Sequence, residues 1–552
     1  MAGLINLSHA RGWLLAVAAG FLLLTGCNFP FAAAPADTGD TAPTETPFQP
    51  GDDPTLDVGF GKDDPLNWYL SSDLPAGVVE LVALPDNASL VEDQTDAQIS
   101  VGLNGGQVVG RWVYALVAPF PTITDEASLD DVQALWRGEG EWLLLVSPET
   151  EAVFTAWWGA PDGVQVLAAD EVLDAAWAQD AWALVPFEAL QPRWKVLLVD
   201  GQSPVHKDFD PASYALSVPI GLQGEDELVN QVLADWGLAE ISNRDSDLMT
   251  TVAVTGVTAL VRATAYEMNR SGITYPAEDV GPLLAGADIT HISNEVPFWD
   301  ECPPPDPFQR GLVFCSDPDY IQLLEAIGTD VIELTGDHFN DHGQDPMLFS
   351  LDLYDQYGIP YYGGGHNLEE ARSAVIFEHN GNRIAFIGCN GKSGYATASD
   401  TRAGAVQCDY EWLANEVGRL HAEGYLVIAT FQHNEVYSFV PQPGLIRDFA
   451  VPAEAGASIV SGSQAHQAHG MDFTDEDTLV TYGLGNMFFD QWTVVDNGDK
   501  ALIGMHVFYG GRYISTELYT IQFIDFAKPR FMTAEERADF LNTLFSASLW
   551  DD

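Results

Sequence analysis

VIELTGDHFNDHG, residues Val331–Gly343, joins a strand pattern to a dense set of polar side chains. Its first residues are β-branched and apolar, and this pattern predicts a short buried strand. The strand gives way to a loop that carries Asp337, His338 and Asp341. In open α/β sheets, ligands bind in the crevice at the carboxyl ends of the strands. The stretch therefore predicts a functional site where this strand ends.

Three further strand patterns end in similar side chains, in the segments ADITHISNEVPF, YLVIATFQHNEVY and ASIVSGSQAHQAHG. The polar residues at their ends are Asn294, Glu295, His433, Glu435, Gln464, His466 and His469. Imidazoles and carboxylates together suit Zn, Mn or Fe, and a bound cation lowers the pKa of its water. Packing and hydrogen bonding alone explain a single histidine at a strand end, but four such strand ends together favour a shared site. We expect His342 and His469 to be exposed bystanders.

These strand patterns belong to a region in which strands and helices alternate. Between Thr250 and Phe526 the alternation predicts a largely parallel or mixed sheet covered by helices. A length of 552 residues predicts two or three domains. The predicted parts are a signal peptide (1–26), lipidated Cys27 with a flexible linker (27–64), a first α/β domain (65–222), a connector helix (223–249), a second α/β domain (250–526) and a C-terminal helix and tail (527–552).

The first residues have the pattern of an export signal. Arg11 precedes the apolar run Trp13–Leu24, and no acidic residue occurs before Cys27. A run of this length predicts a signal peptide rather than a membrane-spanning helix. The residues LTGC that end at Cys27 resemble the bacterial lipobox, which implies cleavage before Cys27 and diacylglycerol on its sulfur. The alternative is an ordinary secreted protein. A lipoprotein with more than one acyl chain would be stably anchored in the cell envelope.

The chain is strongly acidic, with 22 Lys and Arg residues against 81 Asp and Glu residues and a formal net charge of −59. Such a surface repels nucleic acid and anionic lipid headgroups, so we expect no nucleic-acid partner. Two explanations stay open: solubility in a saline or calcium-rich exterior, and specific capture of cations.

Four cysteines follow Cys27 in the sequence, and an even number outside the cytoplasm suggests disulfides. Among the three possible connectivities we predict the sequence-local pairs Cys302–Cys315 and Cys389–Cys408. Zinc binding by these thiols is not expected, because the sequence has no Cys-x-x-Cys spacing. The first of these loops follows Glu295 closely and would stiffen the rim of the predicted site.

The first domain contains a recognisable order of elements. RWVYALVAPF (Arg111–Phe120) predicts a strand, and SLDDVQALWRGEG predicts a helix with Ser128 as its N-cap and Gly138 at its end. A strand ending in Val-Pro-Phe and the segment Pro-Arg-Trp-Lys-Val-Leu follow. This order resembles the type II periplasmic solute-binding fold, which implies a two-lobed α/β module with a cleft for a small ligand. A module used only as a spacer or docking unit is the alternative.

Five segments of the second domain carry a family resemblance. They are SNE (Ser293–Glu295), GDHFNDHG (Gly336–Gly343), HNEVY (His433–Tyr437), GSQAH (Gly462–His466) and YGLGNMFFD (Tyr482–Asp490). They resemble motifs of the CapA family, the poly-γ-glutamate capsule synthesis proteins, and the last segment is the closest match. The resemblance implies an α/β fold of the calcineurin-like metallophosphoesterase type, a layered sandwich, here preceded by the solute-binding-like α/β domain.

The resemblance also implies a metal site. Its ligands would be Glu295, Asp337, His338, His433 and His466. The sequence departs from the family pattern at two positions, since Val257 stands where an acidic ligand is usual and Gln464 where a histidine is usual. We therefore expect one divalent cation, Mn, Zn or Fe, rather than two.

Glu295 and His338 are the predicted catalytic residues. His338 is either a metal ligand or a general acid beside a metal-bound nucleophile. The predicted supporting residues are Asn294, Asp341, Glu435, Gln464 and Asn486. Two of these, Asp341 and Asn486, are expected to fix loops through backbone hydrogen bonds.

The leading hypothesis is a membrane-anchored, extracytoplasmic CapA-like protein. It would take part in the synthesis, attachment or processing of a cell-surface polymer such as poly-γ-glutamate. If the protein is an enzyme, a question that the sequence leaves open, it is a metal-dependent hydrolase or transferase. A polyanionic polymer is an awkward substrate for a chain with a charge of −59 unless cations bridge the two.

The alternative hypothesis is a non-catalytic ligand-binding lipoprotein with a degenerate metallophosphoesterase-like domain. Val257 and Gln464, which replace two usual ligands, favour this alternative. The expected partners are thus a cell-surface polymer or a small ligand, together with the membrane through the lipid anchor.

Overall fold

The structure, a computed structural model, describes residues 65–103, 105–236, 240–392, 394, 396–474 and 477–550. The described residues belong to one compact unit, Asp63–Asp552. The predicted signal peptide, the lipidation site Cys27 and the linker lie outside the described residues. Within the described ranges, every helix falls short of the length or the apolar character that crossing a bilayer requires.

The first part of the chain forms a mixed ten-stranded sheet in the order β2-β1-β3-β11-β4-β8-β6-β7, and β9 and β12 also pair with β4. Its strands are β1 (Leu66–Leu70), β2 (Ala88–Leu90), β3 (Ile99–Leu103), β4 (Gln107–Pro119), β6 (Leu144–Val146), β7 (Val164–Val166), β8 (Trp182–Pro186), β9 (Trp194–Val196), β11 (Ser217–Gly224) and β12 (Ile241–Ser242). The helices are α1 (Ala76–Leu81), α2 (Leu129–Trp136), α3 (Pro148–Trp158), α4 (Val172–Gln179) and α5 (Asp226–Trp236). β5 (Glu126–Ala127) and β10 (Leu198–Val199) form a separate pair.

Local sequence explains the ends of these elements. α2 begins at the predicted cap, where the Ser128 side chain accepts a hydrogen bond from the backbone N–H of Asp131, as capping serines commonly do. Gly138, which follows the helix, has a φ of +71°, a value that glycine adopts without strain. β12 lies within the segment expected to be a connector and pairs with β4.

The second part of the chain forms two large sheets. The eight-stranded sheet has the order β16-β15-β14-β13-β26-β27-β28, with β25 paired to β13, and the six-stranded sheet has the order β18-β19-β21-β22-β24-β23. The strands of the first are β13 (Met249–Thr258), β14 (Ile289–Asn294), β15 (Val331–Glu333), β16 (Tyr361–Tyr362), β25 (Asn486–Phe488), β26 (Lys500–Tyr509), β27 (Arg512–Phe523) and β28 (Pro529–Phe531). Those of the second are β18 (Val375–His379), β19 (Asn382–Asn390), β21 (Leu426–Gln432), β22 (Ile459–Ser461), β23 (Ala468–Thr474) and β24 (Thr478–Leu484). β17 (Gly364–Gly365) pairs with β20 (Gly404–Ala405).

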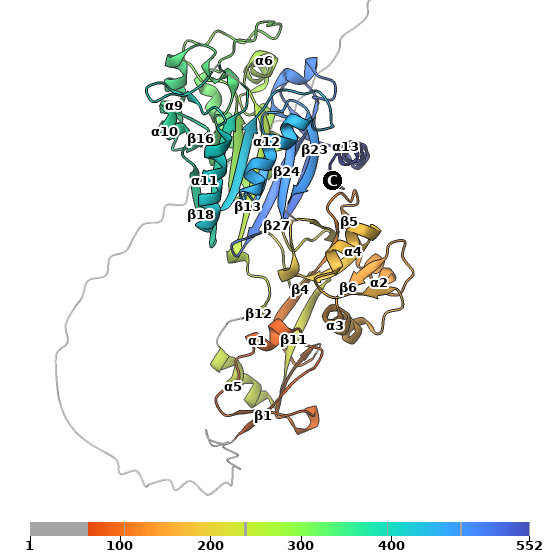
Figure 1. Ribbon diagram of the computed structural model, residues 1–552. Helices are drawn as coiled ribbons and strands as arrows, with labels where there is room; N and C mark the ends of the chain where they lie inside the picture. Colours follow the sequence, from red (N-terminus) through yellow and green to blue (C-terminus); the bar gives the residue numbers. More distant parts are fainter. Residues whose placement is uncertain are drawn as a thin grey trace, which may run out of the picture. The chain divides into compact units, whose positions relative to one another are not determined.

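Helices cover both outer faces of this pair of sheets. They are α6 (Arg262–Ser271), α7 (Gly281–Gly286), α8 (Ile321–Ala326), α9 (Gln344–Tyr357), α10 (Leu368–Ala371), α11 (Tyr410–Ala422) and α12 (Pro443–Glu454). α13 (Ala534–Ser546) instead contributes buried residues to the core between the two sheets. The 3₁₀ helices of the described chain are η1 (Gln94–Asp96), η2 (Phe187–Ala189), η3 (Ser246–Leu248), η4 (Tyr275–Ala277), η5 (Pro318–Tyr320), η6 (Asp337–Asn340) and η7 (Asp490–Val494). Figure 1 shows α11 and α12 lying along the six-stranded sheet.

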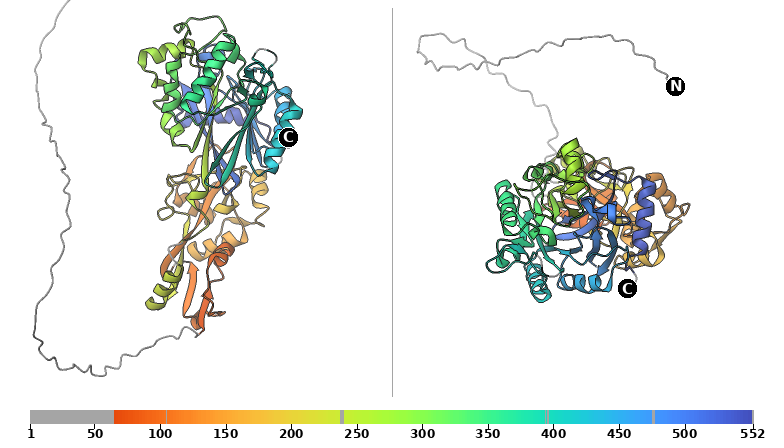
Figure 2. Two further views of the ribbon diagram at one scale, coloured as in Figure 1. Left: turned by 90° about the vertical axis from the view of Figure 1, so that its left-hand side faces the viewer. Right: turned by 90° about the horizontal axis from the view of Figure 1, so that it is seen from above.

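Three hydrophobic cores define the layers of the second part. The two sheets pack face to face through a core that includes Val254 and Phe386. A second core joins the eight-stranded sheet to its helices, for example through Leu351 of α9. A third joins the six-stranded sheet to α11 and α12 through Leu413 and Phe449. The order of helices, sheet, sheet and helices, visible from above in Figure 2, confirms the predicted layered α/β sandwich.

Parallel pairing brings the strand ends of the second part to one edge. β13, β14 and β15 run parallel in one sheet, and β19, β21, β22 and β24 run parallel in the other. β18 and β19 instead pair antiparallel through a turn at Asn380-Gly381, whose φ values of +49° and +75° suit a type I′ turn. The strand ends named in the sequence analysis therefore meet.

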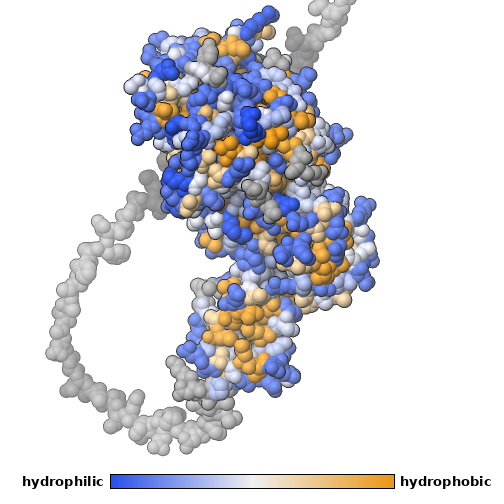
Figure 3. All heavy atoms as spheres, in the orientation of Figure 1, coloured by the Kyte–Doolittle hydropathy of each residue, from blue (hydrophilic) through white to orange (hydrophobic). Residues whose placement is uncertain are grey.

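The surface reflects the acidic composition of the chain. Figure 3 shows one face, on which hydrophilic areas cover much of the surface and hydrophobic areas are separate from one another. The chain has 81 acidic against 22 basic residues, so most of its charged side chains are carboxylates. Basic side chains are correspondingly scarce, so a lysine that contacts several carboxylates marks a place of possible functional interest.

Both predicted disulfides form, Cys302–Cys315 and Cys389–Cys408. The first closes the loop between β14 and η5, and the second joins the end of β19 to the segment before α11. Each therefore fixes a segment that follows a strand end.

Removing one disulfide is expected to destabilise the chain. The loops have sequence separations of 13 and 19 residues. Closing loops of this size lowers the entropy of the unfolded chain and stabilises the fold by about 3 kcal/mol. A Cys302→Ser/Cys315→Ser variant should show this loss in guanidinium unfolding, and an unchanged midpoint at unchanged slope would contradict the prediction.

Candidate metal centre

Glu295, Asp337 and His338 form the centre of the candidate site. One ligand atom of each lies within 4.8 Å of the others. Glu295 is fully buried, and its Oε2 has no hydrogen-bond partner among the described residues. A buried carboxylate oxygen without a partner is costly, and a bound cation would satisfy it.

Local backbone geometry brings these three residues together. Glu295 directly follows β14, and Asp337 and His338 begin η6 just after β15, its parallel neighbour. A Cβ atom on Gly336 would lie 2.5 Å from the carbonyl oxygen of Glu295. Only glycine therefore allows this close approach of the two segments.

In this centre the pKa of each ionisable group depends on the charges of its neighbours. Burial raises the pKa of the Glu295 carboxyl, an effect that the positive charges of His466 and His338 oppose. Burial opposes protonation of His338, but its hydrogen bond to Asp341 and the charge of Glu295 outweigh this effect and raise the pKa of His338 to about 9. The site therefore attracts positive charge.

His338 is held in one orientation. Its Nδ1 lies 2.7 Å from Oδ2 of Asp341, and the same oxygen accepts a hydrogen bond of 2.8 Å from the backbone N–H of Phe314. The ring of Phe314 packs on the imidazole at a centroid distance of 4.8 Å. This arrangement leaves Nε2 as the nitrogen that His338 offers to a metal, since ligand histidines commonly bond a carboxylate through the other nitrogen.

An Asp341→Asn substitution is expected to weaken Mn²⁺ binding by about 10–100-fold, because residues that orient a ligand contribute this much to affinity. An asparagine can keep the bond from the Phe314 backbone, so the fold should persist. Isothermal titration with Mn²⁺ measures the change, and Asp345→Asn, at an exposed aspartate nearby in the sequence, is the matched control. Equal affinities in the two variants would contradict the prediction.

Lys392 is a part of the site that the sequence analysis missed. Its Nζ lies 2.7 Å from Oδ2 of Asp337 and 2.7 Å from Oε1 of Glu435. Burial lowers the pKa of the Lys392 ammonium, but the two carboxylates outweigh this and raise it. Burial raises the pKa of Glu435, but the charges of His466 and Lys392 outweigh this and lower it to about 2. Lys392 is thus a fixed cation between two carboxylates.

Gln432, at the end of β21, joins the two halves of the centre. Its Nε2 donates to Oδ1 of Asp337 over 2.5 Å and lies 3.4 Å from Oε1 of Glu295. Its own Oε1 accepts from Asn390 over 2.6 Å. The structure therefore connects strand ends of both sheets through one amide.

His466 lies near Glu435, the carboxylate that Lys392 also contacts. Its Nδ1 is 3.0 Å from Oδ1 of Asn486, and its Nε2 is 3.9 Å from Oε1 of Glu435. The Asn486 amide also donates to the backbone carbonyls of His466 and Gly498, each over 3.0 Å. Asn486 thus fixes the loop that carries His466 through backbone hydrogen bonds, as expected.

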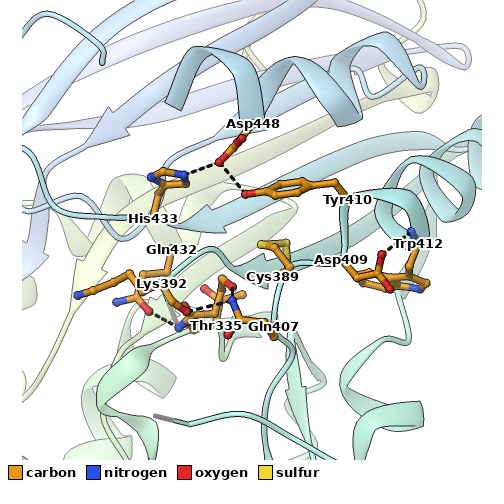
Figure 4. The surroundings of a disulfide bond; sticks show 12 residues. Thr335, Cys389, Lys392, Gln407, Asp409, Tyr410, Trp412, Gln432, His433 and Asp448 are labelled. Atoms are coloured by element: carbon orange, nitrogen blue, oxygen red, sulfur yellow. Dashed lines mark hydrogen bonds and ion pairs between the residues drawn. A yellow bond between two sulfur atoms is a disulfide. The ribbon is translucent and has the colours of Figure 1, made fainter. Parts of the chain in front are cut away.

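His433 lies in a different environment. Its Nε2 is 2.8 Å from Oδ2 of Asp448, which also accepts a hydrogen bond of 2.8 Å from Tyr410. Figure 4 shows His433 and Tyr410 both directed at Asp448, with Lys392 and Gln432 elsewhere in the view. The structure therefore places His433 beside α12 and not in the group formed by Glu295, Asp337 and His338.

The remaining predicted residues have structural contacts. Asn294 donates to the Val296 carbonyl and to the Tyr354 hydroxyl, over 2.9 and 2.7 Å. Gln464 donates to Ser293 over 2.7 Å, and its Oε1 is buried without a partner among the described residues. The expectation that His469 is exposed is wrong, because it is 2% exposed.

A buried ion pair, Arg262–Asp490, packs against the aromatic rings that contact His338 and His466. Arg262 contacts Asp490 through Nε and Nη2, at 2.9 and 2.5 Å. Its guanidinium lies over the rings of Phe314 and Phe489, which pack against His338 and His466 respectively. Arg262 has a φ of +48°, a conformation that costs a residue other than glycine about 1–3 kcal/mol. The surrounding contacts therefore hold a strained residue behind the site.

Val257 occupies the position where the family pattern has an acidic residue. It belongs to a small apolar cluster with Phe314 and Phe489, and its backbone N–H bonds to the Gly485 carbonyl over 3.0 Å. Packing, not ligation, is its observed role.

A second buried network ties the two sheets together. Glu333 of β15 contacts Thr335 over 2.6 Å and also accepts a hydrogen bond from Ser463, which precedes Gln464 in the loop after β22. His291 of β14 lies 3.3 Å from Glu333. Burial raises the pKa of Glu333, but the contacts with His291 and Ser463 outweigh this effect and lower it. This network fixes the loops of both sheets relative to each other.

The donor set fits one divalent cation. Glu295, Asp337 and the Nε2 atom of His338 are oxygen and nitrogen donors of the kind that Mn²⁺, Zn²⁺ and Fe²⁺ accept. His466, also a predicted ligand, is not in this group, and its Nε2 lies 3.9 Å from Oε1 of Glu435. The unpartnered Oε2 of Glu295 is the observation that favours a cation there.

Comparison with known proteins supports the predicted resemblance. Residues 251–491 match the family model described as Bacterial capsule synthesis protein PGA_cap, which confirms the CapA-like character of this region. No curated protein matches the chain.

Three solved structures show distant similarity to the chain. The first part resembles an ABC-type phosphate transport receptor from Vibrio cholerae, with 10% identity, a TM-score of 0.26 and coverage of 31% of this chain and 98% of that chain. The 5'-nucleotidase precursor from Thermus thermophilus shows 13% identity, a TM-score of 0.31 and coverage of 53% and 58%. Haemophilus influenzae NAD nucleotidase shows 12% identity, a TM-score of 0.29 and coverage of 55% and 57%. The chain thus spans little more than half the length of either nucleotidase.

Proposed function

We propose that this chain is a metal-dependent hydrolase or transferase that acts on a cell-surface polymer during capsule synthesis or processing. The observation that carries the proposal is the buried Glu295 carboxylate, whose unpartnered oxygen lies in the same group as Asp337 and His338. The match of residues 251–491 to a capsule-synthesis family supports the kind of substrate.

The residues that would hold the cation are Glu295, Asp337 and His338. Bound there, a divalent cation would supply a water of lowered pKa as nucleophile. Asp341 keeps His338 in place through Nδ1, so that Nε2 keeps its direction. His466 is held at Nδ1 by Asn486, so its Nε2 is the atom that could accept or donate a proton. Gln432 positions both carboxylates from one side.

The proposed location is the exterior face of the membrane. The LTGC sequence ending at Cys27 supports lipid anchoring, and the two disulfides support an oxidising compartment. Poly-γ-glutamate is one polymer within the proposed class. The net charge of −59 means that a polyanion would need cations to bind this surface.

A second candidate function is ligand binding without catalysis. It is supported by Val257 and Gln464 at positions of usual ligands and by the contact of His433 with Asp448. In this case the first domain, proposed as 65–222, would capture a small ligand, and the domain proposed as 250–526 would serve as a scaffold.

Elemental analysis of the chain that begins after Cys27, dialysed against Mn²⁺ or Zn²⁺ and then against buffer, tests the first proposal. We expect about one divalent ion per chain, as the single set of donors implies. The loaded protein is then incubated with poly-γ-glutamate and with a phosphodiester-linked polymer, and soluble fragments are measured. Metal without fragments from either polymer would favour the binding protein, and a metal-free chain would contradict the enzyme.

A further inference from the structure

Lys392 places a positive charge beside the candidate metal centre. Two-metal sites place cations about 3.5–4 Å apart, with shared carboxylates between them. Here Asp337 belongs to the group with Glu295 and His338, and it also contacts the Lys392 ammonium at 2.7 Å. On its far side the same ammonium contacts Glu435 at 2.7 Å. One carboxylate is thus shared between the proposed metal position and a fixed positive charge.

The position of Lys392 is set by the backbone around it. Gln407 donates to the carbonyls of Asn390 and Lys392, over 2.7 and 3.0 Å. The N–H of Gly391 donates to the Gln432 carbonyl over 2.7 Å, and the Cys389–Cys408 disulfide begins one residue before Asn390. Figure 4 shows Lys392 beside Gln432. A lysine held in this way differs from a mobile surface lysine, whose ion pairs contribute little.

The charges around Lys392 also favour a single divalent ion. Glu295, Asp337 and Glu435 carry three negative charges when ionised, and Lys392 carries one positive charge. With neutral imidazoles, one divalent ion balances the remainder. A second would leave an excess of positive charge in a partly buried site, which is costly.

We propose that the Lys392 ammonium replaces the second cation, so that the site holds one divalent ion beside a built-in positive charge. This inference rests on the proposed metal-dependent function. It assigns Lys392 as a positioning residue that holds Asp337 and Glu435 on its ammonium and offsets part of their charge.

The test compares Mn²⁺ stoichiometry in three variants and the unmodified chain by isothermal titration and elemental analysis. Lys392→Ala removes the ammonium and is expected to bind two ions where the unmodified chain binds one. Lys392→Arg keeps the charge and is expected to bind one. Lys528→Ala is the matched control, since Lys528 also contacts two carboxylates, Glu278 at 2.7 Å and Asp279 at 3.4 Å, away from the proposed site.

Thermal unfolding provides a second readout. Without Lys392 the adjacent carboxylates repel each other, so Mn²⁺ should raise the melting temperature of Lys392→Ala more than that of the unmodified chain. Two ions in the unmodified chain, or one in a folded Lys392→Ala, would overturn this inference alone. No ion in the unmodified chain would overturn the proposed function together with it.

Discussion

His338→Ala is expected to lose stoichiometric metal. The substitution removes the Nε2 donor that Asp341 orients, and it leaves Glu295 and Asp337 with less to balance their charge. Affinity for Mn²⁺ should fall by more than about 100-fold, the upper end of the loss caused by changing a residue that only orients a ligand. Any hydrolysis of polymer should fall by about 10²–10⁴-fold if His338 also transfers a proton.

The control for His338→Ala is His342→Ala, a substitution of the histidine four residues further along the chain. His342 contacts Trp299, at a ring distance of 5.4 Å, and is not among the proposed ligands. His342→Ala should keep its metal and its melting temperature. If both variants retain one ion per chain, the group of Glu295, Asp337 and His338 is not the binding site.

Asp490→Ala is expected to destabilise the second part of the chain by about 3–5 kcal/mol, because removing one member of a buried ion pair leaves the other charge unpaired. Asp490 is 4% exposed and Arg262 is 9% exposed, so water cannot easily replace the lost partner. The substitution also removes the acceptor for the Ala263 N–H, at 3.0 Å. Urea unfolding followed by tryptophan fluorescence measures the loss.

A double variant separates the unpaired charge from lost packing. Arg262→Met/Asp490→Leu removes both charges and should recover part of the stability lost in Asp490→Ala, since buried pairs can be replaced by apolar residues at little cost. A loss below about 1 kcal/mol in Asp490→Ala, the level of an exposed pair, would show that the pair is solvated. A double variant less stable than Asp490→Ala would assign the effect to packing.

Much of the fold could be predicted because its signals are local. The strand over Val331–Glu333, the Asn380-Gly381 turn and the helix cap at Ser128 each depend on neighbouring residues. The cysteine pairs were predictable because short loops close most easily. The CapA-like region was recognised from short segments, of which Tyr482–Asp490 was the closest match.

The site could be predicted only in part, because strand register decides which side chains meet. Gln432 ends β21, and its side chain reaches Asp337. Successive side chains along a strand point to opposite sides, so His433, the next residue, reaches Asp448 of α12. The sequence analysis named His433 and passed over Gln432.

Lys392 gave no signal in the sequence. It follows β19 in a loop without a recognisable pattern, and only the pairing of β19 with β21 brings it to Asp337 and Glu435. Arg262 was missed for a related reason, since its contacts with Asp490 and the two phenylalanines join segments far apart in the sequence.

The two disulfides have a consequence for the loading of the proposed metal centre. One ends beside Phe314, whose N–H bonds to the residue that orients His338, and the other begins close to Lys392. In a chain whose cysteines are still reduced, the segments that carry Phe314 and Lys392 therefore lack the disulfides that fix them. A reduced chain should therefore bind Mn²⁺ more weakly than the oxidised chain, so that formation of the disulfides and loading of the proposed centre are linked.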